Sequence, residues 1–346
     1  MQSGEGLTER QARVLEAVIE IYVETAQPAG SQAVAQRSRL GISPASVRTA
    51  MSELEASGHL FQAHASAGRI PTDRAYRVYV NRLVPTVPVN RSTRALIESE
   101  MAPGSRSAID EILRRAAQVL GVLTNELGVA IAPALDGLVL ERLELVRVSS
   151  ERLLAVLTLQ SGMVRTIFVE VPAAVAPEAV AHVSRILNER LAGLPLSEIR
   201  SSLTERLRDA DGAGAGEGLL NIFVAQGEDL FDLSEAGNAV LLGSARQLAD
   251  QPEFADNGRM RHLLAITEQR DVLRRAFEEH HRRGVTITIG SENRDPRLAE
   301  FTLVTSSYRT GGLSGVLGVI GPTRMPYDKI IGLVEHTSRM VEGLMA

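Results

Sequence analysis

The sequence predicts a chain of several α+β domains, the first of which is a small helix bundle with a β-hairpin. Its 346 residues are 44% hydrophobic, which is enough to fill two or three ordinary cores rather than one. Up to residue 58 the hydrophobic residues recur every three or four positions, as in helices. From residue 138 onward, shorter runs that are typical of strands alternate with helical patterns. Charged residues of both signs occur throughout, which indicates a globular chain.

Three helices are expected near the N-terminus. The first begins after Thr8, which has a glutamine three residues later to complete a capping box. The second is short, and we expect the Ser31 hydroxyl to cap it. The third begins after the cap Ser43, with Pro44 at the first helical position, and ends at residues 57–58. Two helices joined by a short turn that contains glycine form the helix-turn-helix pattern of many DNA-binding domains.

The third helix has one hydrophobic and one polar face. The side that should pack into the core carries Val47, Ala50, Met51 and Leu54. The opposite side carries small, hydroxyl-bearing or cationic residues, namely Ala45, Ser46, Arg48, Thr49 and Ser52. Such a surface fits closely into a DNA major groove, where Arg48 can bond a guanine edge or a phosphate. The alternative is an ordinary capped helix whose polar face meets only solvent.

The next segment favours DNA binding. Residues 59–64 and 69–70 have the pattern of two short strands around a tip at residues 65–68. A hairpin directly after a helix-turn-helix is typical of a winged helix, whose wing usually touches phosphate or the minor groove. Between positions 37 and 82 there are seven arginines and three acidic residues, although the whole chain has a formal charge of −5.

We therefore predict a winged helix-turn-helix domain over residues 1–84, with double-stranded DNA as its partner. The residues predicted to contact DNA are Ser31, Ser43, Ala45, Ser46, Arg48, Thr49, Ser52, His64, Ser66 and Arg69.

The remaining three quarters of the chain mix helices and strands. Residues 85–106 are predicted to form a linker, stiffened by prolines. Helices are expected at residues 107–127, 177–192, 257–282 and 327–344. Strands are expected at residues 138–148, 153–160, 164–171, 219–223, 239–242, 285–289, 298–305 and 316–320. Strands flanked by helices, with a differently composed stretch from residue 193, suggest an α+β domain that hosts an insertion.

Several kinds of chemistry are disfavoured. The sequence has no cysteine, which excludes disulfides and cysteine-ligated metals. His280 and His281 are adjacent on an expected helix end and point about 100° apart, so we expect an exposed helix end and no metal site. Glycines cluster at residues 311–321, but neither a phosphate-binding loop motif nor a hydrolase or metalloprotease motif occurs. We expect no cofactor and no enzymatic activity. Because no leader-like or membrane-spanning stretch is present, a cytoplasmic location is expected.

Several strings of the sequence resemble the HrcA family of repressors. In the first domain these are residues 42–48 (ISPASVR), 51–58 (MSELEASG), 66–73 (SAGRIPTD) and 76–80 (YRVYV). Further along they are residues 251–254 (QPEF), 289–293 (IGSEN) and 315–327 (GVLGVIGPTRMPY). One departure is visible, because Thr49 and Ala50 stand where the family usually has Asn and Glu. Since Thr49 lies on the polar face of its helix, we expect that the base preference at this contact can differ.

The resemblance implies a fold and a function. It implies a GAF-like domain formed by residues 107–192 and 257–346, interrupted by an inserted dimerisation domain at residues 193–256. It also implies a homodimeric repressor of heat-shock (chaperone) genes that binds the CIRCE inverted repeat and is modulated by the chaperonin GroEL. The residues leave a second hypothesis open, in which a small molecule binds the GAF-like domain and tunes a winged-helix regulator of other genes.

Overall fold

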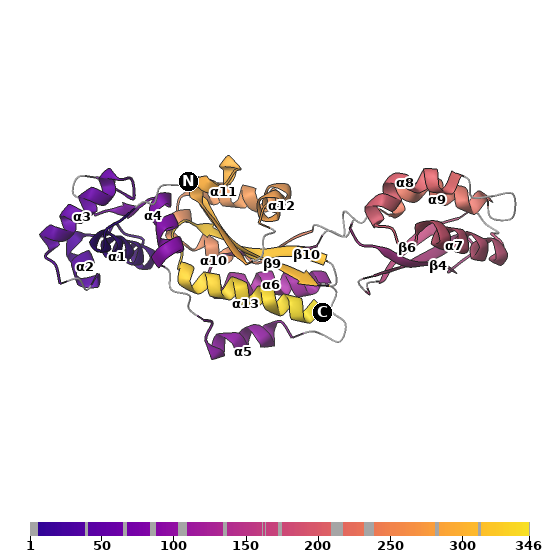
Figure 1. Cartoon of the computed structure of the whole chain (residues 1–346), viewed down its shortest axis with the longest axis horizontal. Coiled ribbons are helices and arrows are strands. Elements are labelled where there is room, and N and C mark those ends of the chain that lie inside the picture. Colours follow the sequence, from indigo (N-terminus) through magenta and orange to yellow (C-terminus); the bar gives the residue numbers. More distant parts are fainter. Residues whose placement is uncertain are drawn as a thin grey trace. The chain divides into compact units, whose positions relative to one another are not determined.

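The computed structural model of this chain forms two compact units (Figure 1). The first comprises Met1–Ala130, Val240–Ser307 and Val316–Leu344, and the second comprises Ile131–Ala239, Tyr308–Gly315 and Met345–Ala346. The structure describes residues 6–38, 41–64, 68–83, 88–102, 109–133, 137–160, 162, 164–171, 175–208, 217–231, 239–280, 284–310 and 313–345.

Residues 6–83, here called the head, form a helix bundle with a two-stranded ribbon. The elements of the head are α1 (Glu9–Thr25), α2 (Ser31–Arg37), α3 (Pro44–Ala56), β1 (Leu60–Phe61), β2 (Ile70–Pro71), α4 (Asp73–Val78) and the π-helix η1 (Tyr79–Leu83). The two strands are antiparallel, with Phe61 opposite Ile70. The expected order of three helices and a hairpin is confirmed, although each strand has only two residues.

Caps fix where the helices of the head begin. Thr8 forms the predicted capping box before α1, and Ser43 caps α3 as predicted. The prediction that Ser31 caps α2 was wrong. Gly30 holds the extended cap conformation (φ −82°, ψ 147°), so Ser31 is the first helical residue.

The core of the head lies between α1 and α3. The predicted core residues of α3 are at most 3% exposed, and they are Val47, Ala50, Met51 and Leu54. They pack with fully buried residues of α1, including Leu15, Val18 and Ile19. Because this side of α3 is used for packing, its polar side is left at the surface.

The rest of the first unit is built on a five-stranded sheet, here called the central sheet. Its strands, in spatial order, are β7 (Val240–Leu242), β3 (Leu127–Ile131), β10 (Leu313–Pro322), β9 (Phe301–Thr310) and β8 (Val285–Ile289). Its helices are α5 (Arg91–Glu100), α6 (Ile109–Thr124), α10 (Arg246–Ala249), α11 (Asn257–Glu268), α12 (Arg270–Glu278) and α13 (Tyr327–Met345), with the short 3-10 turns η2 (Pro252–Phe254), η3 (Gly290–Glu292) and η4 (Pro296–Leu298). Figure 1 shows α11 and α12 on one side of β9 and β10, and α13 on the other.

The second unit has a three-stranded antiparallel sheet with one covered face. Its strands are β4 (Leu140–Arg147), β5 (Arg152–Leu159) and β6 (Val164–Glu170), and its helices are α7 (Pro177–Leu191), α8 (Leu196–Arg208) and α9 (Glu217–Leu230). On β5, the side chains of Leu153, Ala155 and Leu157 are buried on the covered face. Helix α7 contacts the neighbouring strand β4. On the other face Phe168 lies opposite Leu154 and is 61% exposed. This second face is therefore open in a single chain.

The boundaries of the insertion differ from those predicted. The second unit begins at Ile131 rather than at residue 193, and the chain returns to the first unit at Val240 rather than at residue 257. The reason is strand pairing, since β4, β5 and β6 form a sheet of their own and the central sheet takes β3 and β7 on either side of them in sequence.

Some secondary-structure predictions were also wrong. Residues 219–223, expected as a strand, lie in α9, where Leu219 and Phe223 are buried one helical turn apart. The expected helix at residues 257–282 is two helices that meet at Gln269. The expected linker contains α5, and the end of the expected helix at residues 107–127 contains the start of β3. Residues 84–87 of the linker and most of the glycine-rich stretch at residues 211–218 lie outside the described residues.

Candidate nucleic-acid interface

The N-terminal turn of α3 is held in a fixed geometry by its cap. Ser43 Oγ accepts a hydrogen bond from the Ser46 N–H at 3.2 Å and lies 3.1 Å from Ser46 Oγ. Pro44 follows at the first helical position, where the missing N–H costs no hydrogen bond. The free backbone N–H groups of this turn favour an anion such as a DNA phosphate.

The structure brings most of the predicted contact residues of α3 onto one exposed surface. Ala45, Arg48, Thr49 and Ser52 are exposed, and Ser46 is half-buried. The Thr49 hydroxyl donates to the Ala45 carbonyl oxygen at 3.3 Å, so it can turn outward to a base only by giving up that bond. The side chains are short apart from Arg48, which lets the helix backbone approach a groove closely.

The arginines of the head are mostly partnered within the protein. Arg37 pairs with Glu20 and Glu24, Arg69 with Glu55, and Arg77 with Glu292. Arg74 donates to the Ser57 carbonyl oxygen at 2.8 Å. Among the described residues between positions 37 and 82, Arg48 is the one arginine with no hydrogen bond or ion pair to the protein. Within the described part of this stretch, the unpaired cationic side chain therefore lies on α3.

Arg69 links the ribbon to the recognition surface instead of pointing freely outward. Its side chain is 15% exposed, and its Nη2 lies 2.8 Å from Glu55 Oε2, near the end of α3. Its backbone N–H and carbonyl oxygen both bond Ala29 at 2.9 Å. Its carboxylate partner would have to be displaced before Arg69 could bind a phosphate, so Arg69 chiefly positions the ribbon.

The other residues predicted to contact DNA lie in the hairpin and on α2. His64 is exposed at the end of the described part of the hairpin, and Ser66 lies outside the described residues. Ser31 is half-buried on the first turn of α2. His59, in contrast, is 2% exposed and bonds Ser57 Oγ through Nδ1 at 2.9 Å, so it is a packing residue.

Replacing Gly68 with alanine should displace the ribbon. A Cβ at this position would stand 2.7 Å from the Pro28 carbonyl oxygen and closer still to that of Ala29, which the bridge to Arg69 holds in place. We expect the variant to be less stable by about 1–3 kcal/mol. Thermal unfolding of Gly68→Ala would measure this against Gly137→Ala, because a Cβ at Gly137 meets open space. Equal melting temperatures for the two variants would contradict the prediction.

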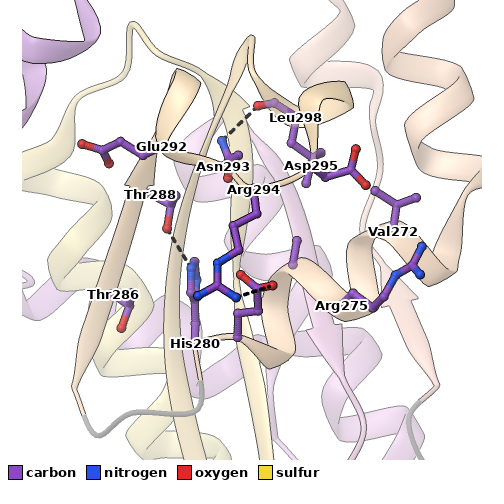
Figure 2. A pocket seen from close by; sticks show the side chains of 12 residues that line it. Val272, Arg275, His280, Thr286, Thr288, Glu292, Asn293, Arg294, Asp295 and Leu298 are labelled. Atoms are coloured by element: carbon purple, nitrogen blue, oxygen red, sulfur yellow. Dashed lines mark hydrogen bonds and ion pairs between the residues drawn. The ribbon is translucent and has the colours of Figure 1, made fainter.

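A polar hollow of about 500 Å³ lies between α12 and β8 (Figure 2). Figure 2 shows Thr286, Thr288 and Glu292 on one side of it and Arg275 on the other. His280, expected at an exposed helix end, is instead buried, with Nδ1 2.9 Å from Thr305 Oγ1 and Nε2 2.7 Å from Thr288 Oγ1. Burial lowers the pKa of His280, which favours its neutral form.

Most of the charged side chains around this hollow have protein partners, but within the described part of the chain the Arg275 side chain has no hydrogen bond or ion pair to the protein. Arg294 pairs with Glu279 at 3.4 Å, and Glu292 pairs with Arg77 of the head. Asp295 accepts from Arg297 at 2.6 Å. A small molecule could meet Arg275 freely, but it would have to compete with protein partners for the other charged groups, which gives the ligand-sensing hypothesis only weak support.

The structure gives little support to other chemistry. Among the described residues, no three histidines or carboxylates come together as metal ligands, and no helix is long and apolar enough to cross a membrane. His281 lies outside these residues.

The glycine-rich segment forms strand β10, where Gly318 passes close to the backbone of Val304. Arg324, which follows it, bonds a backbone carbonyl and a carboxylate rather than an open anion site.

Comparison with known proteins gives a consistent family match. The family model described as "HrcA protein C terminal domain" matches residues 110–331. The "Heat-inducible transcription repressor HrcA" of Chlorobium phaeobacteroides (strain BS1) is 36% identical over 343 residues, covering 95% of this chain and 96% of the relative. The protein of that name from Geobacter sulfurreducens is 34% identical and covers 98% of both chains. A crystal structure of a hypothetical protein has a similar fold, with a TM-score of 0.64, 23% identity, and coverage of 98% of this chain and 99% of that one.

Proposed function

This chain belongs to the HrcA family, and on that premise we propose that it is a non-enzymatic, heat-inducible repressor of chaperone genes. It binds the CIRCE inverted repeat as a homodimer, and GroEL modulates its activity. The observation that carries DNA binding is the exposed surface of α3, with Arg48 unpaired among short polar side chains.

In this proposal the head is a winged helix and α3 is the recognition helix. The capped N-terminal turn of α3 approaches the DNA backbone, while Arg48, Thr49 and Ser52 reach base edges in the major groove. The ribbon lies beside it, held in place by Arg69. Few arginines of the head are free, so we expect the affinity for DNA to fall only modestly as salt is added. The slope of log affinity against log salt concentration should correspond to about one neutralised phosphate for each unpaired arginine.

The open face of the three-stranded sheet is the proposed dimer interface. Val146, Leu154 and Phe168 lie in one row across β4, β5 and β6, because the register pairs Val146 with Leu154 and Leu154 with Phe168. The exposed fractions are 47% for Val146 and 61% for Phe168. A row of exposed apolar side chains is costly in water, and burying it against a second copy across a two-fold axis removes that cost. A two-fold protein then matches a two-fold operator.

The regulation proposed here follows the family. GroEL promotes the active form of the repressor, and unfolded proteins compete for GroEL during heat stress. Repression is then relieved and chaperone synthesis rises until GroEL is free again.

Fluorescence anisotropy with a labelled CIRCE duplex and a shuffled duplex of equal length tests the proposal at one stated salt concentration. We expect tight binding to CIRCE alone, with one dimer per duplex, and a gain in affinity when GroEL is added. Equal, weak binding to both duplexes in the presence of GroEL would contradict the proposed operator.

Replacing Arg48 with alanine should narrow the discrimination between CIRCE and a mutated operator by about 1–3 kcal/mol, the range for one bidentate contact to guanine. The same anisotropy assay measures it, with Arg37→Ala as the matched control because Arg37 is engaged by Glu20 and Glu24. An equal loss on CIRCE and random DNA would instead make Arg48 a phosphate contact.

A further inference from the structure

The head is fastened to the central sheet through α4. The Asp73 carboxylate accepts hydrogen bonds from the Ser291 N–H and the Ser291 hydroxyl, both at 2.9 Å. Gly290 makes this approach possible, because it adopts a positive φ of 53° and a Cβ there would stand 2.5 Å from Asp73 Oδ1. The close contact between α4 and η3 therefore requires glycine at position 290.

One helical turn further along α4, Arg77 makes a second connection. Its guanidinium donates to both oxygens of Glu292, with Nε 2.7 Å from Oε1, and to the Ile287 carbonyl oxygen at 2.7 Å. Burial raises the pKa of Glu292, but hydrogen bonds from Arg77 and from the Ile289 N–H lower it by more, so the carboxylate stays ionised. A planar guanidinium bound at three points fixes direction as well as distance.

Arg324 makes a third connection from the segment before α13. Its Nη1 donates to the Val23 carbonyl oxygen at 2.7 Å, in the last turn of α1, where helix carbonyls lack an intrahelical partner. Its other nitrogens are bound by Glu253, with Nη2 2.9 Å from Oε2. Both side chains are largely buried, at 13% and 18% exposed.

An apolar contact lies between these polar ones. Tyr76 of α4 and Tyr327 of α13 are 1% and 0% exposed, and their ring centroids are 5.8 Å apart. The contacts thus join both α1 and α4 of the head to two segments beside the central sheet, residues 287–292 and residues 324–327. Attachment through two helices of the head restrains rotation of the head as well as its translation.

We propose that Asp73, Arg77 and Arg324 are positioning residues that hold the head in one orientation and thereby set the half-site spacing that the repressor reads. This inference rests on the proposed binding of an inverted repeat by a dimer. Adding one base pair between half-sites moves one of them by about 3.4 Å and turns it by roughly 35°. A head held in one orientation can reach its half-site at only one spacing. A head that rotates freely can reach its half-site at several spacings, but the effective concentration of the second binding event is then lower at each of them.

The test is a panel of operators that differ only in the number of base pairs between their two arms, together with a duplex that carries a single arm. We expect wild-type affinity to peak at one spacing. In Arg77→Ala the ratio of affinities between the best spacing and one base pair more should fall about 2- to 30-fold. Affinity for the single arm should stay unchanged, because Arg77 faces the central sheet.

Arg37→Ala is the matched control, since it removes the same charge and also breaks ion pairs with carboxylates, but those partners, Glu20 and Glu24, lie within the head. It should lower all affinities equally or leave them unchanged. Glu292→Gln and Ser291→Ala are milder changes on the opposite side of the contact and serve if Arg77→Ala does not fold. An unchanged spacing profile in the folded variants, or a flat profile in the wild type, would overturn the inference. Failure of the wild type to bind any inverted repeat would instead reject the proposed function.

Discussion

A glutamate in place of Phe168 should convert the dimer into a monomer and weaken operator binding roughly 100- to 10,000-fold, the range of gain that a second linked site provides. Phe168 is 61% exposed at the edge strand β6 and faces Leu154 across the sheet. In the proposed dimer a carboxylate here would be buried against apolar side chains of the second copy, without a partner to offset its loss of hydration. The folded monomer should tolerate the change because the position is open to solvent.

Sedimentation or light scattering would measure the mass, and anisotropy would measure the affinity for full and single-arm operators. Thr204→Glu is the matched control, since Thr204 is exposed on α8 of the same unit and gains the same charge. We expect Phe168→Glu to bind a single arm as well as the wild type does. A Phe168→Glu protein that remains a dimer would place the interface elsewhere.

Local signals predicted the head well. A capping box at Thr8, a serine and a proline at the start of α3, and hydrophobic residues spaced by three and four act within a few residues of each other. Such signals survive in the fold because nothing distant competes with them. Ser31 is the exception, since the backbone is still extended at Gly30 and Ser31 already occupies the first helical position, one residue past the cap.

The limits of the insertion could not be predicted in this way. Strands β4–β6 have the same local pattern whichever sheet they join, and only pairing between distant segments shows that β3 and β7 belong to the central sheet. The spacing of the apolar residues of α9 is likewise compatible with either a short strand or a helix. Packing against α8 stabilises the helix.

The charged residues of the head can be counted from the sequence, but their ion-pair partners cannot be predicted from it. Arg69 and Arg77 belong to the basic stretch that predicted DNA binding, yet both are engaged by carboxylates. Glu292 lies 215 positions away from Arg77, and no spacing rule connects them. Several strings that resemble the family, at residues 66–73, 76–80, 251–254, 289–293 and 315–327, contribute residues to the contact between head and central sheet.

Glu126 is a buried carboxyl group in the network behind Arg324. It is 1% exposed, accepts a hydrogen bond from Gln251 Nε2 at 3.0 Å and packs against Gly321, where a Cβ would stand 2.5 Å from its Cδ. Gln251 Oε1 in turn lies 3.4 Å from Arg324 Nη2. Burial raises the pKa of Glu126 well above its ordinary value of 4.5, more than the Gln251 bond and Arg324 lower it. The folded protein therefore holds this group protonated at a pH where the unfolded chain has released the proton.

Replacing Glu126 with glutamine should make the protein more stable than the wild type at neutral and alkaline pH. Because the folded pKa lies above the unfolded one, the contribution of Glu126 is full below the ordinary carboxyl pKa and is lost as the pH rises toward the folded value. Over that window the free energy of unfolding of the wild type should fall relative to Glu126→Gln by up to about 1.4 kcal/mol per pH unit. Melting temperatures from pH 4 to pH 8 would measure the difference, with Glu268→Gln on the exposed end of α11 as the control. A constant difference across this range would mean that Glu126 is ionised in the fold, and that Arg324 outweighs burial.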